Sequence, residues 1–248
     1  MTAQFITQLG PYSEARSPAG RTLNMWRYDA GFQKPPAPHR VLPESRLSLV
    51  TESLYAPSGE VLSQAHWVFG PIRTPRLYAP PPGSVLEGAF ILPEHALCQL
   101  GVRPDELTDA ILPQSDFPRL ERLPVHPPRQ QDRLAIWAAR LVRATKGRVR
   151  ANVLAERAGV SERHLHRCMS GRLGVGPKAL AGQIRALSAI EHADRSDRPD
   201  WADIAIASGY SDQAHLSRSL KSLTGLTPTA LHAERSVESE IFKTEPAL

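Results

Sequence analysis

Two stretches of the chain carry hydrogen-bonding side chains in the same register. The sequence HLHRCMSGRLGVGPKAL at 164–180 recurs as HLSRSLKSLTGLTPTAL at 215–231, and LAERAGVS at 154–161 recurs as IAIASGYS at 204–211. Arginine can donate two parallel hydrogen bonds to guanine, and glutamine can bond adenine in the same way. The chemistry that this pattern indicates is recognition of base edges in a DNA groove.

The candidate base-reading residues project away from the apolar stripe of each copy. They are Arg163, His166 and Arg167 in the first copy, and Gln213, Ala214, Ser217 and Arg218 in the second. A single arginine or histidine is more often a solvated surface residue, but two copies in register favour a shared role. Arg167 and Arg218 have a further alternative, which is to pair with phosphate or to brace a neighbouring helix.

A second group of polar and basic residues flanks these positions, and we assign it to the DNA backbone. It consists of Arg148, Arg150, Ser161, Arg172, Lys178, Arg185, Ser211 and Lys221. Contacts with phosphate supply affinity and fix the register, but they carry little sequence information. For each residue alone, plain solvation is the alternative.

Each copy has the pattern of a helix, a tight turn with glycine, and a second helix. In the first copy a short helix over 151–158 leads through Gly159 to a helix over 161–171. Ser161 can cap this second helix by accepting a backbone N–H bond. This order is the helix-turn-helix pattern, and because it occurs twice the sequence predicts two such units.

Two longer helices are expected around these units. The first runs from about residue 133 to 146 and buries a stripe that includes Leu134 and Trp137. The second follows Pro177, a residue favoured in the first helical turn, and runs to about Ala193, which gives a rigid spacer of roughly 24 Å. Asp200 can then cap the next helix.

Charge and proline divide the chain into two halves. Residues 129–235 hold 18 Lys and Arg against 10 Asp and Glu, a net of +8, whereas residues 1–128 hold 11 against 12. Of the 23 prolines, 19 lie before residue 129, and proline is poorly tolerated inside helices. We therefore expect a β-rich regulatory domain over 1–120, a linker over 121–132, a helical domain over 133–235 and a flexible tail over 236–248.

The first half shows short β-forming segments between stretches rich in proline and glycine. Strands are expected at 21–28, 46–51, 61–69 and 85–91, followed by helices over 93–101 and 103–117. This spacing is typical of a small antiparallel barrel or sandwich. The fold class is therefore α+β, with a barrel-like first domain followed by an all-α second domain.

Metal and catalytic sites are not indicated. His39, His66, His95 and His126 are isolated, and no nucleophile or phosphate-loop motif occurs, so we expect neither a metal, nor a cofactor, nor an enzyme. The alternative is an alkyl-accepting thiol at Cys98, although a buried helix cysteine is the more common case. No apolar run is long enough for a membrane span and no signal peptide is visible, so a cytoplasmic location is expected.

Residues 131–235 resemble the DNA-binding domain of the AraC/XylS family of transcription regulators. The most specific segment is DIAIASGYSDQAHLSRSLKSLTGLTP, although Leu216 and Leu220 stand where the family usually has phenylalanine. The resemblance implies seven helices, two recognition helices in successive major grooves, and RNA polymerase as a partner. The segment ALCQLGVRPDELTDAILPQSDF resembles the sensor domain of one branch, which implies a cupin-like β fold that binds a small-molecule effector or a second subunit.

The leading hypothesis is a sequence-specific transcription regulator that binds double-stranded DNA and is controlled by its first domain, through an effector or as a homodimer. A DNA-anchored enzyme or alkyl-acceptor sensor using Cys98 is the second hypothesis. A non-specific nucleoid protein is the third, but phosphate-only binding does not need two recognition helices.

Overall fold

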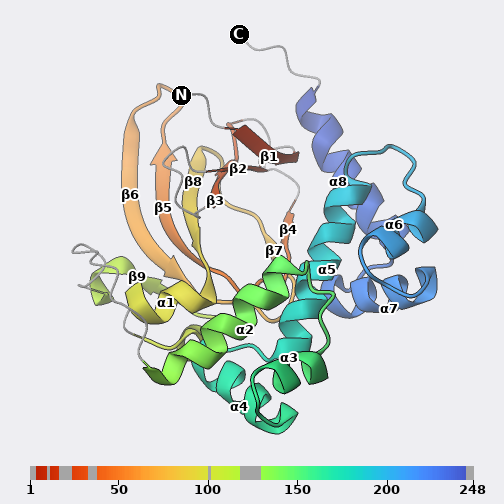
Figure 1. The fold of residues 1–248 in the computed structure, drawn as a ribbon. Helices are drawn as coiled ribbons and strands as arrows, with labels where there is room; N and C mark the ends of the chain where they lie inside the picture. Colours follow the sequence, from red (N-terminus) through yellow and green to blue (C-terminus); the bar gives the residue numbers. More distant parts are fainter. Residues whose placement is uncertain are drawn as a thin grey trace.

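A sheet region and a helical region make up the chain in the computed structural model (Figure 1). It describes residues 4–9, 12–16, 24–32, 38–99, 102–117 and 130–243. Most of the expected linker, with His126, therefore lies outside the described residues. Among those residues, no helix has the length and apolar character that a membrane span requires, and no three metal-ligating side chains come together.

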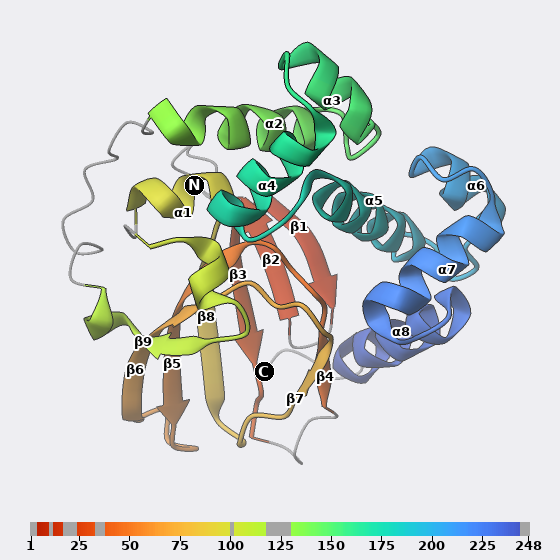
Figure 2. The ribbon, with the colours of Figure 1, turned by 90° about the horizontal axis from the view of Figure 1, so that it is seen from below.

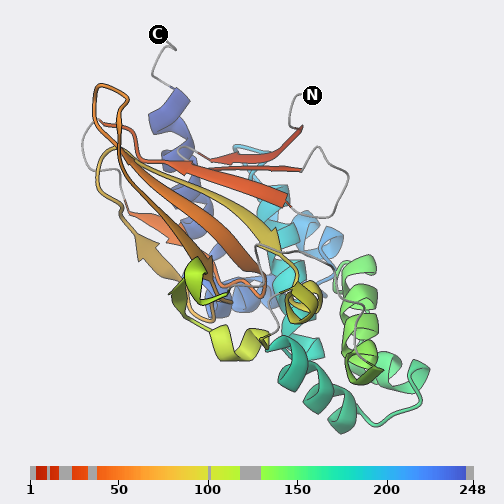
Figure 3. The same ribbon diagram turned by 90° about the vertical axis from the view of Figure 1, so that its left-hand side faces the viewer.

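The sheet region is built around seven antiparallel strands. They are β1 (Gln4–Leu9), β2 (Tyr12–Arg16), β3 (Asn24–Asp29), β5 (Leu47–Tyr55), β6 (Val61–Phe69), β8 (Ser84–Ile91) and β9 (Ile111–Pro113), in the order β1-β2-β3-β8-β5-β6-β9. A separate pair is formed by β4 (His39–Val41) and β7 (Arg76–Tyr78). Among these strands β1 and β9 pair on one side only, so the sheet is open and the barrel-like domain expected from the sequence does not close (Figure 3).

The expected strands at 46–51, 61–69 and 85–91 correspond to β5, β6 and β8, and the one at 21–28 overlaps β3. The helix expected over 103–117 is wrong. This segment forms two 3₁₀ turns, η1 (Pro104–Leu107) and η2 (Gln114–Asp116), with β9 between them. Asp109 has a φ of 60°, which breaks a helix, and the backbone of β9 pairs with β6 instead.

The sheet packs around two apolar clusters. Leu47, Val68 and Ile91 lie with Leu107 of η1 in one cluster, which α1 (Pro93–Gln99) helps to close. In the other, Trp26 stands directly opposite Gly88 on the neighbouring strand. A Cβ at Gly88 would lie 2.3 Å from the Trp26 ring, so only glycine leaves room for the indole there.

Within residues 130–243 the chain forms seven α-helices, the number that the family resemblance implies. They are α2 (Arg133–Ala144), α3 (Ala151–Arg157), α4 (Glu162–Leu173), α5 (Pro177–Ala193), α6 (Trp201–Ala207), α7 (Gln213–Thr224) and α8 (Pro228–Lys243). A 3₁₀ turn, η4 (Gln130–Asp132), precedes them. Because α8 continues to Lys243, it includes residues that were expected to form a tail.

Each helix-turn-helix unit has its own apolar core, and α5 contributes to both. Leu165, Met169 and Leu180 are buried in the first core, and Leu216 and Leu220 in the second. The two leucines that depart from the family pattern therefore still fill the second core. Figure 2 shows α3 and α4 on one side of α5, and α6 and α7 on the other.

One expected core residue of α2 is exposed. Trp137 has 38% of its surface exposed, whereas Ala135, Ala138, Ala139 and Val142 are buried. The buried stripe of α2 is thus centred about one position away from Trp137. The packing of α2 on α4 and α5 is therefore made through small side chains, which lets the helices approach closely.

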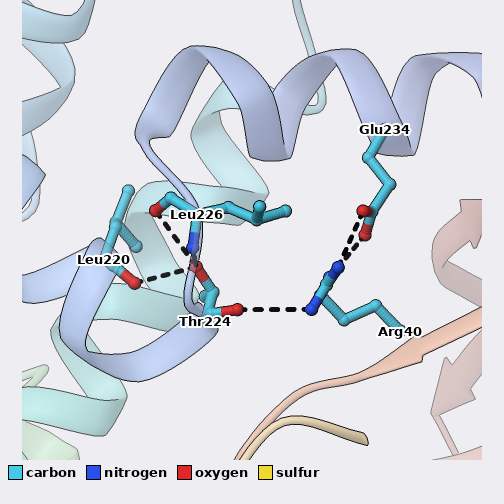
Figure 4. A network of polar contacts seen from close by, with 5 residues as sticks. All are labelled: Arg40, Leu220, Thr224, Leu226 and Glu234. Atoms are coloured by element: carbon cyan, nitrogen blue, oxygen red, sulfur yellow. Dashed lines mark hydrogen bonds and ion pairs between the residues drawn. The ribbon is translucent and has the colours of Figure 1, made fainter. Parts of the chain in front are cut away.

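The sheet region contacts both helix-turn-helix units. On the first, Arg143 of α2 donates two hydrogen bonds to Glu94, at 3.0 and 3.4 Å, and Glu94 is only 1% exposed. On the second, Arg40 of β4 donates to Glu234 of α8 at 2.6 and 3.0 Å and to the Thr224 carbonyl at 3.5 Å (Figure 4). We refer to these contacts as the sheet–helix interface.

Candidate nucleic-acid interface

The two recognition helices begin with side-chain caps of different kinds. The Ser161 hydroxyl accepts a hydrogen bond from the His164 backbone N–H at 3.2 Å, as the sequence predicts. In the second unit the cap is Asp212, which accepts from His215 N–H at 2.7 Å. The extra residue of the second copy moves the capping position from Ser211 to Asp212. The Ser211 hydroxyl instead donates to the Asp212 carboxylate at 2.8 Å.

These hydrogen bonds keep the Asp212 carboxylate charged. The backbone N–H of His215 and the hydroxyl of Ser211 lower the pKa of Asp212 below its ordinary value. A negative charge is favourable at this place because the first turn of a helix presents unpaired N–H groups. Asp212 is thus occupied with the helix end, although it also borders the reading surface described below.

The outer face of α4 carries the predicted reading residues of the first unit. Arg163, His166 and Arg167 are exposed, whereas Leu165 and Met169 are fully buried behind them. Arg167 shares a hydrogen bond of 3.1 Å with the ring of His164, one turn earlier. Arg163, His166 and Arg167 are therefore exposed on the outer face of α4, and their role in base reading stays a prediction.

His166 has a restricted position on that face. A Cβ at Gly176 would lie 2.8 Å from Nε2 of His166, so the imidazole lies against the backbone of the turn after α4. The first helix therefore presents Arg163 and Arg167 more freely than His166. The sequence reasoning did not distinguish these three residues.

The second unit gathers its predicted residues around one shallow, open hollow. Gln213, Ala214, Ser217 and Arg218 line it together with Asp212. All of them come from the first turns of α7 or from its cap, which is the part of a recognition helix that meets base edges. The sequence reasoning assigned no role to His215, whose ring shares a 3.2 Å hydrogen bond with Ser211 and packs edge-on against Tyr210.

The predicted phosphate contacts separate into two groups. Arg150, Lys178 and Lys221 are exposed, and so are Ser161 and Ser211, whose hydroxyls also take part in the helix caps. The three remaining arginines bond to other parts of the chain. Arg172 pairs with the buried Asp132 at 3.5 Å, Arg148 donates to the Ala207 carbonyl, and Arg185 donates to the Gly147 carbonyl at 3.3 Å. The sequence showed their charge but not these partners.

The two cysteines lie in different regions, Cys168 in α4 and Cys98 in α1. Cys168 is half-buried in the first core, and burial raises the pKa of its thiol, which favours the unreactive protonated form. Cys98 belongs to α1, but its side chain lies outside the described residues. The expected role of Cys98 as an alternative acceptor thus stays a prediction.

The chain matches one family model in this region. Residues 154–234 match a helix-turn-helix domain, which covers both recognition helices and the spacer between them. This region is a helix-turn-helix domain. The match agrees with the resemblance to the DNA-binding domain of AraC/XylS regulators that the two repeated segments indicated.

The chain is also similar to several solved structures. The C-terminal domain of AraT, a response regulator from Geobacillus stearothermophilus, is 23% identical, covers 43% of this chain and 89% of its own, and has a TM-score of 0.39. An AraC-type transcriptional regulator from Chromobacterium violaceum is 24% identical, with coverages of 42% and 93% and a TM-score of 0.37. ToxT from Vibrio cholerae is 10% identical, with coverages of 87% and 98% and a TM-score of 0.45. The comparison with curated proteins gives no match.

Proposed function

We propose that the chain is a sequence-specific transcription regulator in which α4 and α7 enter successive major grooves on one face of DNA. The observation that carries this proposal is the pair of exposed reading faces, each backed by its own core and joined by the single helix α5. A helix of 17 residues spans about 26 Å, which is compatible with two grooves about one helical turn apart.

Base recognition is assigned to the exposed residues of these helices. Arg163, His166 and Arg167 act from α4, and Gln213, Ala214, Ser217 and Arg218 act from α7. Arginine suits guanine and glutamine suits adenine, because each can form two hydrogen bonds with that base. Arg150, Lys178 and Lys221 support them by contacting phosphate, together with the hydroxyls of Ser161 and Ser211.

Control of DNA binding is assigned to the sheet region. Its support is the sheet–helix interface, in which Glu94 holds the first unit and Arg40 holds the second. An effector or a second copy of the chain that shifts the sheet would change how both units are held. RNA polymerase is the further partner that the family resemblance implies, and the proposed activity contains no chemical step. We propose domain limits of 1–120 and 133–235 for these two roles.

Selection of bound sequences from random duplex DNA by the full chain tests the proposal. We expect an enriched site with two halves about 10 base pairs apart, because each unit reads one major-groove segment. Enrichment of a single half, or of no sequence at all, would contradict a reader with two recognition helices. The Arg163→Ala variant provides the internal control, since it should change the preference in one half only.

A further inference from the structure

Five residues meet where the two helix-turn-helix units face each other across α5. Gly147 and Arg148 follow α2 in the first unit, Arg185 lies in the middle of α5, and Gly209 and Tyr210 form the turn between α6 and α7. We name this cluster the inter-unit junction. Two of its members, Arg148 and Arg185, are predicted from the sequence to bind phosphate.

Arg185 connects the two units directly. Its guanidinium donates to the Gly147 carbonyl of the first unit at 3.3 Å and lies over the Tyr210 ring of the second, 5.3 Å from the ring centre. Its Nε is buried and has no hydrogen-bond partner among the described residues. A guanidinium over an aromatic face is attracted by the ring quadrupole, and the attraction grows when water is excluded.

Arg148 connects the first unit to the second. It starts in the first unit and donates to the carbonyl of Ala207, at the end of α6 in the second unit. Both arginines converge on Gly209, where a Cβ would lie 3.0 Å from Cγ of Arg148 and 3.5 Å from Cδ of Arg185. Gly209 has a φ of +81°, so the turn needs glycine for its backbone as well as for the arginine side chains.

Tyr210 carries the connection into the second recognition helix. It is 4% exposed, its ring packs edge-on against His215 with centres 5.1 Å apart, and its hydroxyl shares a 3.1 Å hydrogen bond with Ser219. Both partners belong to α7. A change in the position of the Tyr210 ring would therefore move the helix that presents Gln213 and Arg218.

We infer that Arg185 and Arg148 are positioning residues that set the distance and angle between the two recognition helices, and so the spacing between half-sites that the protein accepts. This inference rests on the proposed function. The Arg185 guanidinium is occupied by a backbone carbonyl of the first unit and a buried ring of the second, and the Arg148 guanidinium by a backbone carbonyl of the second unit. To bind phosphate, either arginine would have to give up these contacts, whereas a positioning role keeps the contacts that the structure shows.

The test measures binding of the full chain to duplexes in which the two selected half-sites are separated by the preferred spacing, or by one or two base pairs more or fewer. Arg185→Lys keeps the positive charge but loses the planar stacking on Tyr210. Arg148→Lys also keeps the charge but loses the guanidinium that donates to the Ala207 carbonyl. We expect both variants to bind the preferred spacing less tightly and to reduce its advantage over altered spacings by roughly five- to tenfold.

Lys178→Ala is the matched control, because Lys178 is exposed and belongs to the same helix as Arg185. It should weaken binding at every spacing alike and lower the salt slope by about one. Circular dichroism confirms that each variant is folded, and if Arg185→Lys is not, Arg148→Lys carries the test. A spacing preference as sharp as that of the wild type in the folded variant overturns the inference. A loss of affinity in Arg185→Lys that is the same at every spacing also overturns the inference.

The same measurements separate this inference from the proposed function. A wild-type protein that enriches no bipartite site overturns the proposed function, and the inference with it. A wild-type protein that binds both half-sites but tolerates every spacing equally overturns the inference alone.

Discussion

At the scale of single residues, the reading face of α4 makes the sharpest prediction. Arg163 is exposed and has no ion-pair partner among the described residues, so its guanidinium is free to meet a base. Arg163→Ala should cost about 1–3 kcal/mol on the selected site and relax the preference at one or two base pairs. Binding profiles against a randomised site check this. An unchanged base preference in the folded variant would remove Arg163 from the reading residues.

The cap of α7 makes a pH prediction. The pKa of Asp212 is lowered in the folded chain, so its contribution to stability is present above the ordinary value of 3.8 and is lost as the pH falls through the lowered pKa. Asp212→Asn keeps a capping oxygen that does not titrate. Unfolding measured between pH 5 and pH 2.5 should show a steeper loss for the wild type than for this variant. The same loss of stability with falling pH in the wild type and in Asp212→Asn would contradict this prediction.

At the scale of elements, the sequence was most informative in the helical region, where the two repeated copies can be aligned residue by residue. The caps at Ser161 and Asp200, the start of α5 at Pro177 and both reading faces were all predictable, because helical period and capping act locally. The segment 103–117 was misread because its pairing partner, β6, lies far away in the chain. The backbone carbonyls that accept from Arg148 and Arg185 were beyond prediction for the same reason, because they also lie far away in the chain.

Two glycines test how the elements pack. A Cβ at Gly88 would collide with Trp26 on the neighbouring strand, whereas Gly182 lies inside α5 with open space around it. Gly88→Ala should therefore lower the free energy of unfolding by about 1–3 kcal/mol, and Gly182→Ala should raise it by up to about 1 kcal/mol. Denaturant unfolding of both variants measures the contrast. Equal changes in the two variants would show that the strand contact is not tight.

At the scale of the whole molecule, the sheet region holds the two helix-turn-helix units at two separate points. Glu94 is buried on the first unit and Arg40 is partly buried on the second, 54 residues apart in the sequence. Each unit has its own core, to which the sheet region adds the partly buried Leu42 in the second unit, so we expect the helices to fold without the sheet. The sheet–helix interface therefore couples two regions whose apolar cores are largely separate.

This separation of cores predicts that residues 129–243 fold and bind DNA without the sheet region. The net charge of +8 over 129–235 should make the binding strongly dependent on salt, because phosphate contacts release bound counterions. Titrations of labelled duplex at increasing salt measure the slope. Flat binding between low and physiological salt would contradict the assignment of the exposed basic residues to phosphate.

The coupling itself predicts how the full chain unfolds. Breaking a buried ion pair by removing one partner costs about 3–5 kcal/mol, because the remaining charge stays buried, while a partly exposed pair contributes less. Glu94→Gln combined with Arg40→Ala should therefore loosen the sheet from both units. In calorimetry we expect one main transition for the wild type and two for the double variant, one for the sheet and one for the helices. The unfolding of each single variant should be intermediate between that of the wild type and that of the double variant, and Glu94→Gln should have the larger effect because Glu94 is the more deeply buried.

Two transitions already in the wild type, or one in the double variant, would mean that these contacts do not join the regions. A regulator controlled through its sheet would then need another route between the two.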